Sequence, residues 1–345
     1  MLAAALLIAC SPSPESAPPS AAETPAVTTR GLDPEIMAQT VERAGELDRL
    51  HALIVARDGE ILAEHRFRGP GLDTPVNIKS ASKSVLSAIT GVAIETGVLE
   101  GTDQAIAPIL ARDLPSDPDP RISRITVAHL LTMRAGLGRT SGRHYGAWVA
   151  SPNWVRHALA RPFEAEPGGQ MLYSTGSSHL LSAVLTRASG RSTLALAREW
   201  LAEPLDISLP EWPRDAQGVY FGGNDMLMSP RALVRFGELY RQDGMIDGRR
   251  ILPAGWVEES WRPRTTSPWS GNAYGYGWFV RQAAGHDVYF AWGYGGQMLF
   301  VIPDLDLTVV MISDSAPHPR AESHLPMLHA LLDEGIVPAA IAGGG

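Results

Sequence analysis

The segment Asn77-Ile78-Lys79-Ser80-Ala81-Ser82-Lys83 is the most informative in this chain, because it places a hydroxyl and an amine at the start of a long apolar helix expected over residues 80–98. Residues three apart lie on one face of a helix, one turn apart, so Ser80 and Lys83 can share a proton. Serine becomes a nucleophile when a base removes its proton, and lysine can be that base when burial lowers its pKa from about 10.4. The alternative is a helix N-cap followed by a solvated lysine.

Lysine is rare in this sequence. The chain has 345 residues with 29 Lys and Arg, and Lys79 and Lys83 are the two lysines among them. Arginine stays protonated, whereas a desolvated lysine can lose its proton, so a lysine kept beside Ser80 favours a chemical role. The alternative is a codon bias that favours arginine, with the two lysines left at these positions by chance. The composition, 45% hydrophobic and 19% charged, is that of a globular protein, and the net charge of −8 excludes a nucleic-acid footprint.

Two further segments carry candidate site residues. Tyr173, in Pro167-Gly168-Gly169-Gln170-Met171-Leu172-Tyr173-Ser174-Thr175-Gly176, precedes an expected helix and could protonate a leaving group, although a buried core tyrosine has the same surroundings. Residues 291–297, Ala-Trp-Gly-Tyr-Gly-Gly-Gln, form a glycine-rich crossing between two strands, where a substrate could approach backbone amides. The alternative there is a tight hairpin.

The order of strand-like and helix-like segments predicts an α+β fold. Alternating or apolar runs at residues 51–56, 61–67, 274–282, 287–292, 297–303 and 307–312 predict strands at both ends of the chain, and the middle reads as helices. We therefore expect one antiparallel sheet built from both chain ends and flanked by helices. The expected divisions are an α/β domain of residues 31–100 plus 264–338, a helical domain of residues 101–263, and a flexible tail of residues 339–345.

The N-terminus resembles a bacterial lipoprotein signal. An apolar run, residues 1–9, ends in Leu7-Ile8-Ala9-Cys10, and a Pro/Ser-rich segment with five prolines follows to residue 29. The resemblance implies cleavage before Cys10, acylation of Cys10, and a disordered tether over residues 10–30 that anchors a periplasmic protein to the outer membrane. No Lys or Arg precedes the apolar run, and a disordered apolar N-terminus in a cytoplasmic protein is the alternative.

Taken together, the three segments resemble, in order and rough spacing, the serine β-lactamase-like hydrolases. These include class C β-lactamases, D-alanyl-D-alanine peptidases, family VIII carboxylesterases and 6-aminohexanoate-oligomer hydrolases. The resemblance covers nearly all of residues 33–335 and implies that fold, with a helical domain inserted between the two parts of the sheet. It also implies Ser80 as the acylated nucleophile, Lys83 as its activating amine, Tyr173 as the proton shuttle, and the backbone amides of Ser80 and Tyr294 as the oxyanion hole.

Departures from the family pattern bear on the substrate. Where β-lactamases and peptidases carry Lys-Thr-Gly, this chain has Trp292-Gly293-Tyr294, so the cation that would hold a substrate carboxylate is missing, and an arginine such as Arg264 or Arg143 would have to replace it. Thr175 stands where class C β-lactamases have asparagine. We therefore expect hydrolysis of small esters or simple amides. The expected substrate-binding residues are Thr175, Trp292, Gly293, Gly295, Tyr145 and Trp148, the last two as an apolar pocket shared with Trp154.

Two other functions stay open at this point. One is a β-lactamase or D-alanyl-D-alanine peptidase of the same mechanism, and the other is a catalytically silent envelope binding protein. The ten histidines show no metal-ligand spacing, no cofactor motif follows a strand, and the single cysteine excludes a disulfide framework, so we expect neither metal nor cofactor. The expected membrane contact is through the lipid anchor alone, and the sequence gives no oligomeric state.

Overall fold

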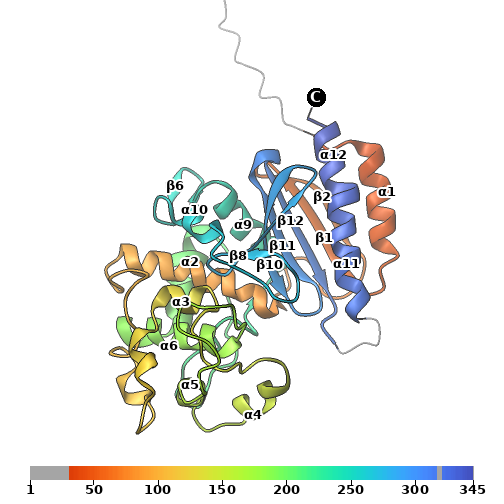
Figure 1. The fold of residues 1–345 in the computed structure, drawn as a ribbon. Helices are drawn as coiled ribbons and strands as arrows, with labels where there is room; N and C mark the ends of the chain where they lie inside the picture. The colour runs from red at the N-terminus through yellow and green to blue at the C-terminus, as the bar shows by residue number, and fades with distance from the viewer. Residues whose placement is uncertain (1–30, 317–320, 345) are drawn as a thin grey trace, which may run out of the picture.

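An eight-stranded antiparallel sheet forms the centre of the computed structural model, which describes residues 31–316 and 321–344. Its strand order, β2-β1-β12-β11-β10-β9-β8-β7, pairs the first strands of the chain with the last one. The predicted α+β fold with a sheet from both chain ends is therefore confirmed (Figure 1). The strands are β1 (Leu50–Arg57), β2 (Glu60–Arg66), β7 (Thr265–Thr266), β8 (Ala273–Tyr274), β9 (Phe279–Ala283), β10 (His286–Gly293), β11 (Gln297–Ile302) and β12 (Leu307–Ser313).

Both faces of this sheet are buried, and the strand alternation divides the apolar side chains between them. In β1, Ile54 and Ala56 join the core on one face, whereas Leu53 and Val55 join the core on the other face. Successive side chains of a strand point to opposite faces, so a strand covered on both sides becomes continuously apolar. This explains why the central strands read as unbroken hydrophobic runs in the sequence.

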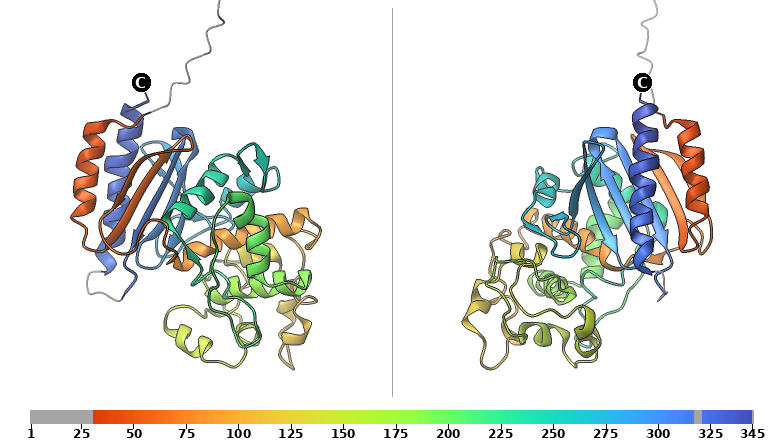
Figure 2. Two further views of the ribbon diagram at one scale, coloured as in Figure 1. Left: turned by 180° about the vertical axis from the view of Figure 1, so that it is seen from behind. Right: turned by 45° about the vertical axis from the view of Figure 1, so that its right-hand side comes forward.

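The N- and C-terminal helices cover one face of the sheet, side by side (Figures 1 and 2). The helix α1 (Pro34–Gly45) begins at Asp33, whose carboxylate accepts hydrogen bonds from the amides of Glu35 and Ile36. The C-terminal helix runs through α11 (Ala321–Leu331), a short π-helical segment (Leu332–Ile336) and α12 (Val337–Ala342).

The expected flexible tail of residues 339–345 is corrected by this helix. Ala339 and Ala340 are fully buried, and the carbonyl of Ala339 accepts a hydrogen bond from the amide of Asp33 at 2.8 Å. Their burial against α1 outweighs the small, glycine-rich composition that suggested fraying. By length and composition, the helical run His324–Ala342 could cross a membrane. Its buried apolar side chains, including Leu328, pack instead against the sheet and α1.

The opposite face carries α2 (Ser82–Glu95) and α9 (Pro230–Arg241). Because α9 packs on β1, β11 and β12, the expected helical domain of residues 101–263 is too long at its C-terminal end. Gly237 makes this contact possible, since a Cβ there would lie 2.5 Å from Thr308 and 2.7 Å from Leu299.

Most of the remaining helices form a second region, which lies lower in Figure 1 and includes α3, α4, α5 and α6, whereas α10 lies beside α9. The helix α2 joins the two regions, because it contacts β10 on one side and α6 on the other, and α6 in turn contacts α3 and α5. These helices and the short ribbons near them are α3 (Val127–Leu131), α4 (Tyr145–Val149), α5 (Trp154–Leu159), α6 (Thr175–Ser189), α7 (Thr193–Ala197), α8 (Glu203–Leu205), α10 (Trp256–Trp261), and the pairs β3 (Val76–Asn77) with β4 (Leu227–Met228) and β5 (Met245–Ile246) with β6 (Arg249–Arg250).

One predicted strand is divided in two. The expected strand over residues 274–282 is broken between β8 and β9 at Gly277, which has φ +79°. A Cβ at Gly277 would lie 2.7 Å from the carbonyl oxygen of Lys83, so the chain turns there because it passes directly over the start of α2. The expected signal, tether and lipidation site at Cys10 lie outside the described residues.

Candidate active site

Ser80 lies in a single 3-10 turn (Lys79–Ala81) that leads into α2, at the point where both regions meet. The residue before it, Lys79, has the left-handed φ of +52°, which is uncommon for a residue with a side chain. The Asn77 side-chain oxygen accepts a hydrogen bond from the Lys79 amide at 2.9 Å, and the Lys79 carbonyl accepts one from the Ser82 hydroxyl at 2.6 Å. These bonds hold the chain in a conformation that presents Ser80 to the cleft.

The Lys83 amine lies beside the Ser80 hydroxyl, as the spacing predicts. Lys83 Nζ is 3.0 Å from Ser80 Oγ and donates a hydrogen bond of 2.7 Å to the carbonyl oxygen of Gly223. The Lys83 side chain is 3% exposed, and this burial lowers its pKa from 10.5 to about 7, while the negative charge of Asp225 acts in the opposite direction. A large fraction of Lys83 is therefore neutral at pH 7 and can accept a proton.

Tyr173 completes this cluster. Its hydroxyl interacts with the Ser80 side chain, and Lys83 Nζ lies 4.9 Å from the centre of its ring. Burial raises the pKa of the Tyr173 hydroxyl to about 12, so the group keeps its proton at neutral pH and can donate it. The structure thus brings together the three side chains that the sequence analysis selected from two distant segments.

Hydrogen bonds between two loops fix the position of Tyr173. The Ser174 hydroxyl accepts a hydrogen bond of 3.0 Å from the Thr140 amide, and the Thr140 hydroxyl accepts one of 2.7 Å from the Gly176 amide. The Ser141 hydroxyl likewise accepts a hydrogen bond of 2.8 Å from the Thr175 amide. Thr175 therefore serves as a backbone anchor for this loop, and it also lines the cleft.

The loop at Gly222 and Gly223 holds the other side of Lys83, and sequence reasoning missed it. Gly223 has φ +69°, and a Cβ there would lie 2.6 Å from Lys83 Cγ. The Gly222 amide donates to His179 Nδ1 at 3.3 Å, and His179 Nε2 lies 3.1 Å from the buried carboxylate of Asp215. The pair of glycines at residues 222–223 was the available sequence signal, since a glycine is required where backbone packs this closely.

Lys79, the other lysine of the chain, forms an ion pair near the site. Its Nζ lies 3.2 Å from Asp225 Oδ1, which accepts a further hydrogen bond of 2.7 Å from Asn77 Nδ2. Both side chains of the ion pair are about three-quarters buried or more. The pair therefore ties the segment before Ser80 to the segment after Gly223, and it places a neutralising cation beside the carboxylate that acts on Lys83.

The third predicted segment forms the end of β10 and the turn that follows. A Cβ at Gly293 would lie 2.2 Å from the Ile78 carbonyl oxygen, so the absent side chain lets β10 approach the Ser80 segment closely. Gly293 is buried behind the cleft, whereas Trp292, Tyr294 and Gly295 line it. This close approach brings the backbone at Tyr294 to the same cleft as Ser80.

A cleft of about 1050 Å³ surrounds Ser80. One part of its wall is aromatic and the other is polar, as expected for a pocket that binds a small organic molecule. The lining residues are Lys79, Ser80, Arg139, Ser141, Gly142, Tyr145, Tyr173, Thr175, Asn224, Asp225, Trp269, Phe279, Trp292, Tyr294, Gly295, Gly296, His324 and Leu325.

Trp148 does not line this cleft, which corrects the sequence expectation. Its side chain is fully buried, its indole N–H donates to the Trp154 carbonyl, and its ring packs on Phe221 and His179. Trp154 lies in the same aromatic cluster. Tyr145 does face the cleft, where its hydroxyl accepts a hydrogen bond of 3.1 Å from Asn224.

The arginines proposed from sequence are placed elsewhere. Arg264 pairs with Glu259 and its guanidinium lies 4.0 Å from the Tyr276 ring centre, away from the cleft lining. Arg143 is hydrogen-bonded to the neighbouring His144 and is also absent from the lining. Arg139 is the arginine that lines the cleft.

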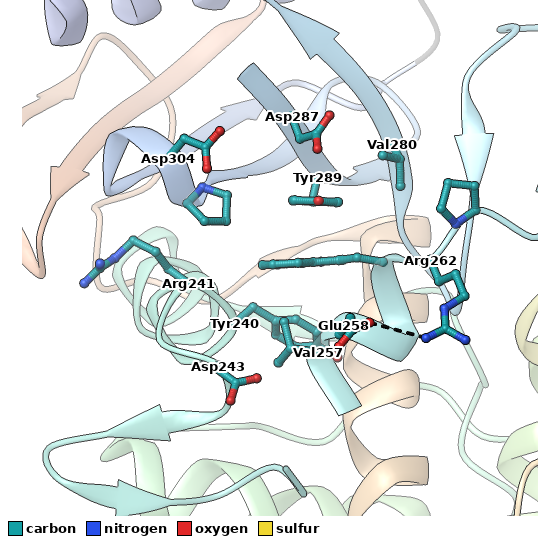
Figure 3. A pocket seen from close by; sticks show the side chains of 13 residues that line it. Tyr240, Arg241, Asp243, Val257, Glu258, Arg262, Val280, Asp287, Tyr289 and Asp304 are labelled. Carbon is teal, nitrogen blue, oxygen red and sulfur yellow. Dashed lines mark hydrogen bonds and ion pairs between the residues drawn. The ribbon is translucent and has the colours of Figure 1, made fainter. Parts of the chain in front are cut away.

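A second hollow of about 580 Å³ lies between α9, α10 and the strands β9 and β10 (Figure 3). Trp261 stacks on Tyr289 there with ring centres 3.9 Å apart, and Glu258 pairs with Arg262 at its rim. It contains none of the Ser80 cluster, so it is not the candidate active site. Within residues 31–316 and 321–344, no group of three or more His, Cys, Asp or Glu side chains could hold a metal ion.

Comparison with known proteins identifies the family and the fold. The family model named Beta-lactamase matches residues 46–334. EstCE1, a hydrolase with promiscuous acyltransferase activity, has 19% sequence identity and a TM-score of 0.66 over 84% of this chain and 95% of its own.

Two further solved structures share the fold. A D-stereospecific amidohydrolase from Streptomyces sp. has 17% identity and a TM-score of 0.65, covering 86% of this chain and 97% of its own. The octameric penicillin-binding protein homologue from Pyrococcus abyssi has 19% identity and a TM-score of 0.68, covering 86% and 76% respectively. Identities this low show a shared fold.

Proposed function

Because the chain belongs to the β-lactamase family, we propose that it is a serine hydrolase that cleaves small esters or simple amides through an acyl-enzyme on Ser80. The observation that carries this proposal is the contact of 3.0 Å between Ser80 Oγ and a Lys83 amine whose pKa is lowered to about 7. A buried neutral amine beside a hydroxyl is one arrangement that can activate serine as a nucleophile.

The proposed reaction has two stages. Ser80 Oγ attacks the substrate carbonyl carbon while its proton passes to Lys83 Nζ, and the backbone amides of Ser80 and Tyr294 stabilise the oxyanion. Tyr173 donates its proton to the leaving group as the carbonyl–leaving-group bond breaks, and the Lys83 ammonium, close to the Tyr173 ring, restores that proton. Water then attacks the ester on Ser80 and releases the acid, with the same groups moving its protons.

The preference for esters and simple amides over β-lactams rests on the cleft wall. Trp292 stands where β-lactamases have the lysine that binds a substrate carboxylate. Apart from Lys83, the chain has one other lysine, Lys79, which is already paired with Asp225. The similarity in fold to a hydrolase with acyltransferase activity and to an amidohydrolase supports the same class of reaction. We also propose, from the sequence alone, that a lipid on Cys10 anchors the protein to the outer membrane.

The test is covalent labelling of the full-length protein with a fluorophosphonate, followed by mass spectrometry of the labelled peptide. We expect the label on Ser80, its loss in Ser80→Ala, and its retention in the matched control Ser84→Ala, whose hydroxyl donates to the Gly277 carbonyl. Turnover of p-nitrophenyl butyrate is then compared with turnover of a chromogenic cephalosporin. An unlabelled Ser80 would favour a silent binding protein, and faster cephalosporin cleavage would favour a β-lactamase.

A further inference from the structure

Arg139 is placed where it can contact the leaving group of a substrate. Its Nε donates a hydrogen bond of 3.0 Å to the carbonyl oxygen of Tyr173, and its side chain lines the cleft that contains Ser80. Because Nε is engaged, the two terminal nitrogens of the guanidinium are left to meet a ligand, and they form a fork that matches a carboxylate.

The charge of Arg139 is not balanced by the protein. Among residues 31–316 and 321–344, no carboxylate forms an ion pair with it, whereas the Lys79 ammonium in the same cleft is paired with Asp225 at 3.2 Å. His324 also lines the cleft, but burial lowers its pKa to about 4, so it is neutral at pH 7. In a chain with net charge −8, Arg139 therefore brings an uncompensated positive charge to the cleft.

An aromatic side chain lies on the same side of the cleft. The Trp269 ring meets the Tyr173 ring edge-on, with centres 5.3 Å apart, and 47% of Trp269 is exposed. The Tyr173 hydroxyl interacts with the Ser80 side chain, so a leaving group that takes its proton must lie next to Tyr173. Such a group is then bounded by the Trp269 ring and the Arg139 guanidinium.

We propose that Arg139 determines substrate specificity by binding a carboxylate on the leaving-group half of the substrate. The substrate class is then an ester or simple amide whose leaving group combines an apolar or aromatic body with a negative charge several bonds from the cleaved bond. This proposal rests on the proposed hydrolase function. Arg139 is exposed, and exposed ion pairs are weak because water competes for both charges, so the expected preference is about two- to fivefold.

Two esters that differ in one charge test the proposal with the full-length protein. The substrates are the butyrate ester of 3-hydroxybenzoate and the butyrate ester of methyl 3-hydroxybenzoate, and the readout is the ratio of their kcat/KM values. We expect the wild type to prefer the carboxylate ester by about two- to fivefold, mainly through KM, and this preference to fall as salt is added. Arg139→Gln should abolish the preference, and Arg139→Lys should restore part of it.

The controls separate binding from structure. Arg143→Gln removes a neighbouring arginine that is bonded to His144 and does not line the cleft, and it should leave both rates unchanged. If Arg139 acted only by holding Tyr173 in place, Arg139→Gln would lower kcat for both esters and keep their ratio, which would overturn the proposal. Equal kcat/KM for the two esters in the wild type would also overturn it. No hydrolysis of either ester, together with an unlabelled Ser80, would remove the proposed function and this proposal with it.

Discussion

The pH dependence of Ser80 acylation should follow the protonation of Lys83. The amine must be neutral to accept the serine proton, and its pKa is lowered to about 7 by burial. The Tyr173 hydroxyl, with a pKa raised to about 12, stays protonated throughout the accessible range. We therefore expect the acylation rate to rise through a single ionisation and then to remain constant.

The lowered pKa gives the size of the effect. With a pKa of about 7, roughly half of the Lys83 amines are neutral at pH 7, about a tenth at pH 6 and about a hundredth at pH 5. The acylation rate should fall by about tenfold for each pH unit below 6 and form a plateau above pH 8. An ordinary lysine, with a pKa of about 10.4, would instead still be gaining rate at pH 9.

The assay is the second-order rate of fluorophosphonate labelling at Ser80, because labelling reports acylation without deacylation. Thermal unfolding at each pH shows whether the protein is folded over the range measured. A labelling rate that is constant from pH 5 to 9, or one that keeps rising to pH 10, would contradict the assignment of Lys83 as the base.

Three further predictions concern the same cluster. Lys79→Met leaves the Asp225 charge uncompensated and should raise the midpoint of the labelling profile by a few tenths of a pH unit to about one unit. Asp225→Asn should lower this midpoint, and the midpoint of the Lys79→Met/Asp225→Asn double variant should lie between those of the two single variants. Because burial lowers the Lys83 pKa, the unfolded chain binds more protons than the folded chain between pH 7 and 10.5. The stability of the wild type relative to Lys83→Met should therefore fall as the pH decreases through that window, and the difference should be constant below it. Chemical denaturation of both proteins at pH 6, 8 and 10 measures this difference. Gly223→Ala should lower the labelling rate at least tenfold and destabilise the fold by about 1–3 kcal/mol, because its Cβ would clash with Lys83 Cγ at 2.6 Å. The control Gly218→Ala is also at positive φ but has open space around it, so it should lower the stability and leave the labelling rate unchanged. Labelling losses of the same size in both alanine variants would contradict this explanation.

Much of the fold could be predicted because its signals are local. The strands at both ends of the chain follow from β-branched and aromatic runs, and the proximity of Ser80 and Lys83 follows from helix periodicity. The sequence around Tyr173 made it a candidate, but its role followed only from the family resemblance, since a tyrosine before a helix has no distinctive pattern of its own. The structure then shows that its hydroxyl interacts with the Ser80 side chain.

The missing parts depend on contacts between distant residues. The Lys79–Asp225 pair joins positions 146 apart, and both residues have positive φ, which composition does not reveal. Trp148 was misassigned because an aromatic residue in a helical region gives no indication of whether it faces a cleft or the core. The same difficulty affected the arginines, because loop conformation decides that Arg139 faces the cleft while Arg264 pairs with Glu259.

The position of the two chain ends has a practical consequence. The C-terminal helix begins its cleft contact at His324 and ends at Ala342, where Gly31 lies against Gly343. At 1.5 Å per residue the run from His324 to Ala342 is about 27 Å long, so Gly31 and Gly343 lie at the end of the helix that is remote from His324 and the candidate cleft. A fusion partner or a solid support joined directly at Gly31 would therefore be attached at the end of this helix that is remote from the cleft-lining residue His324.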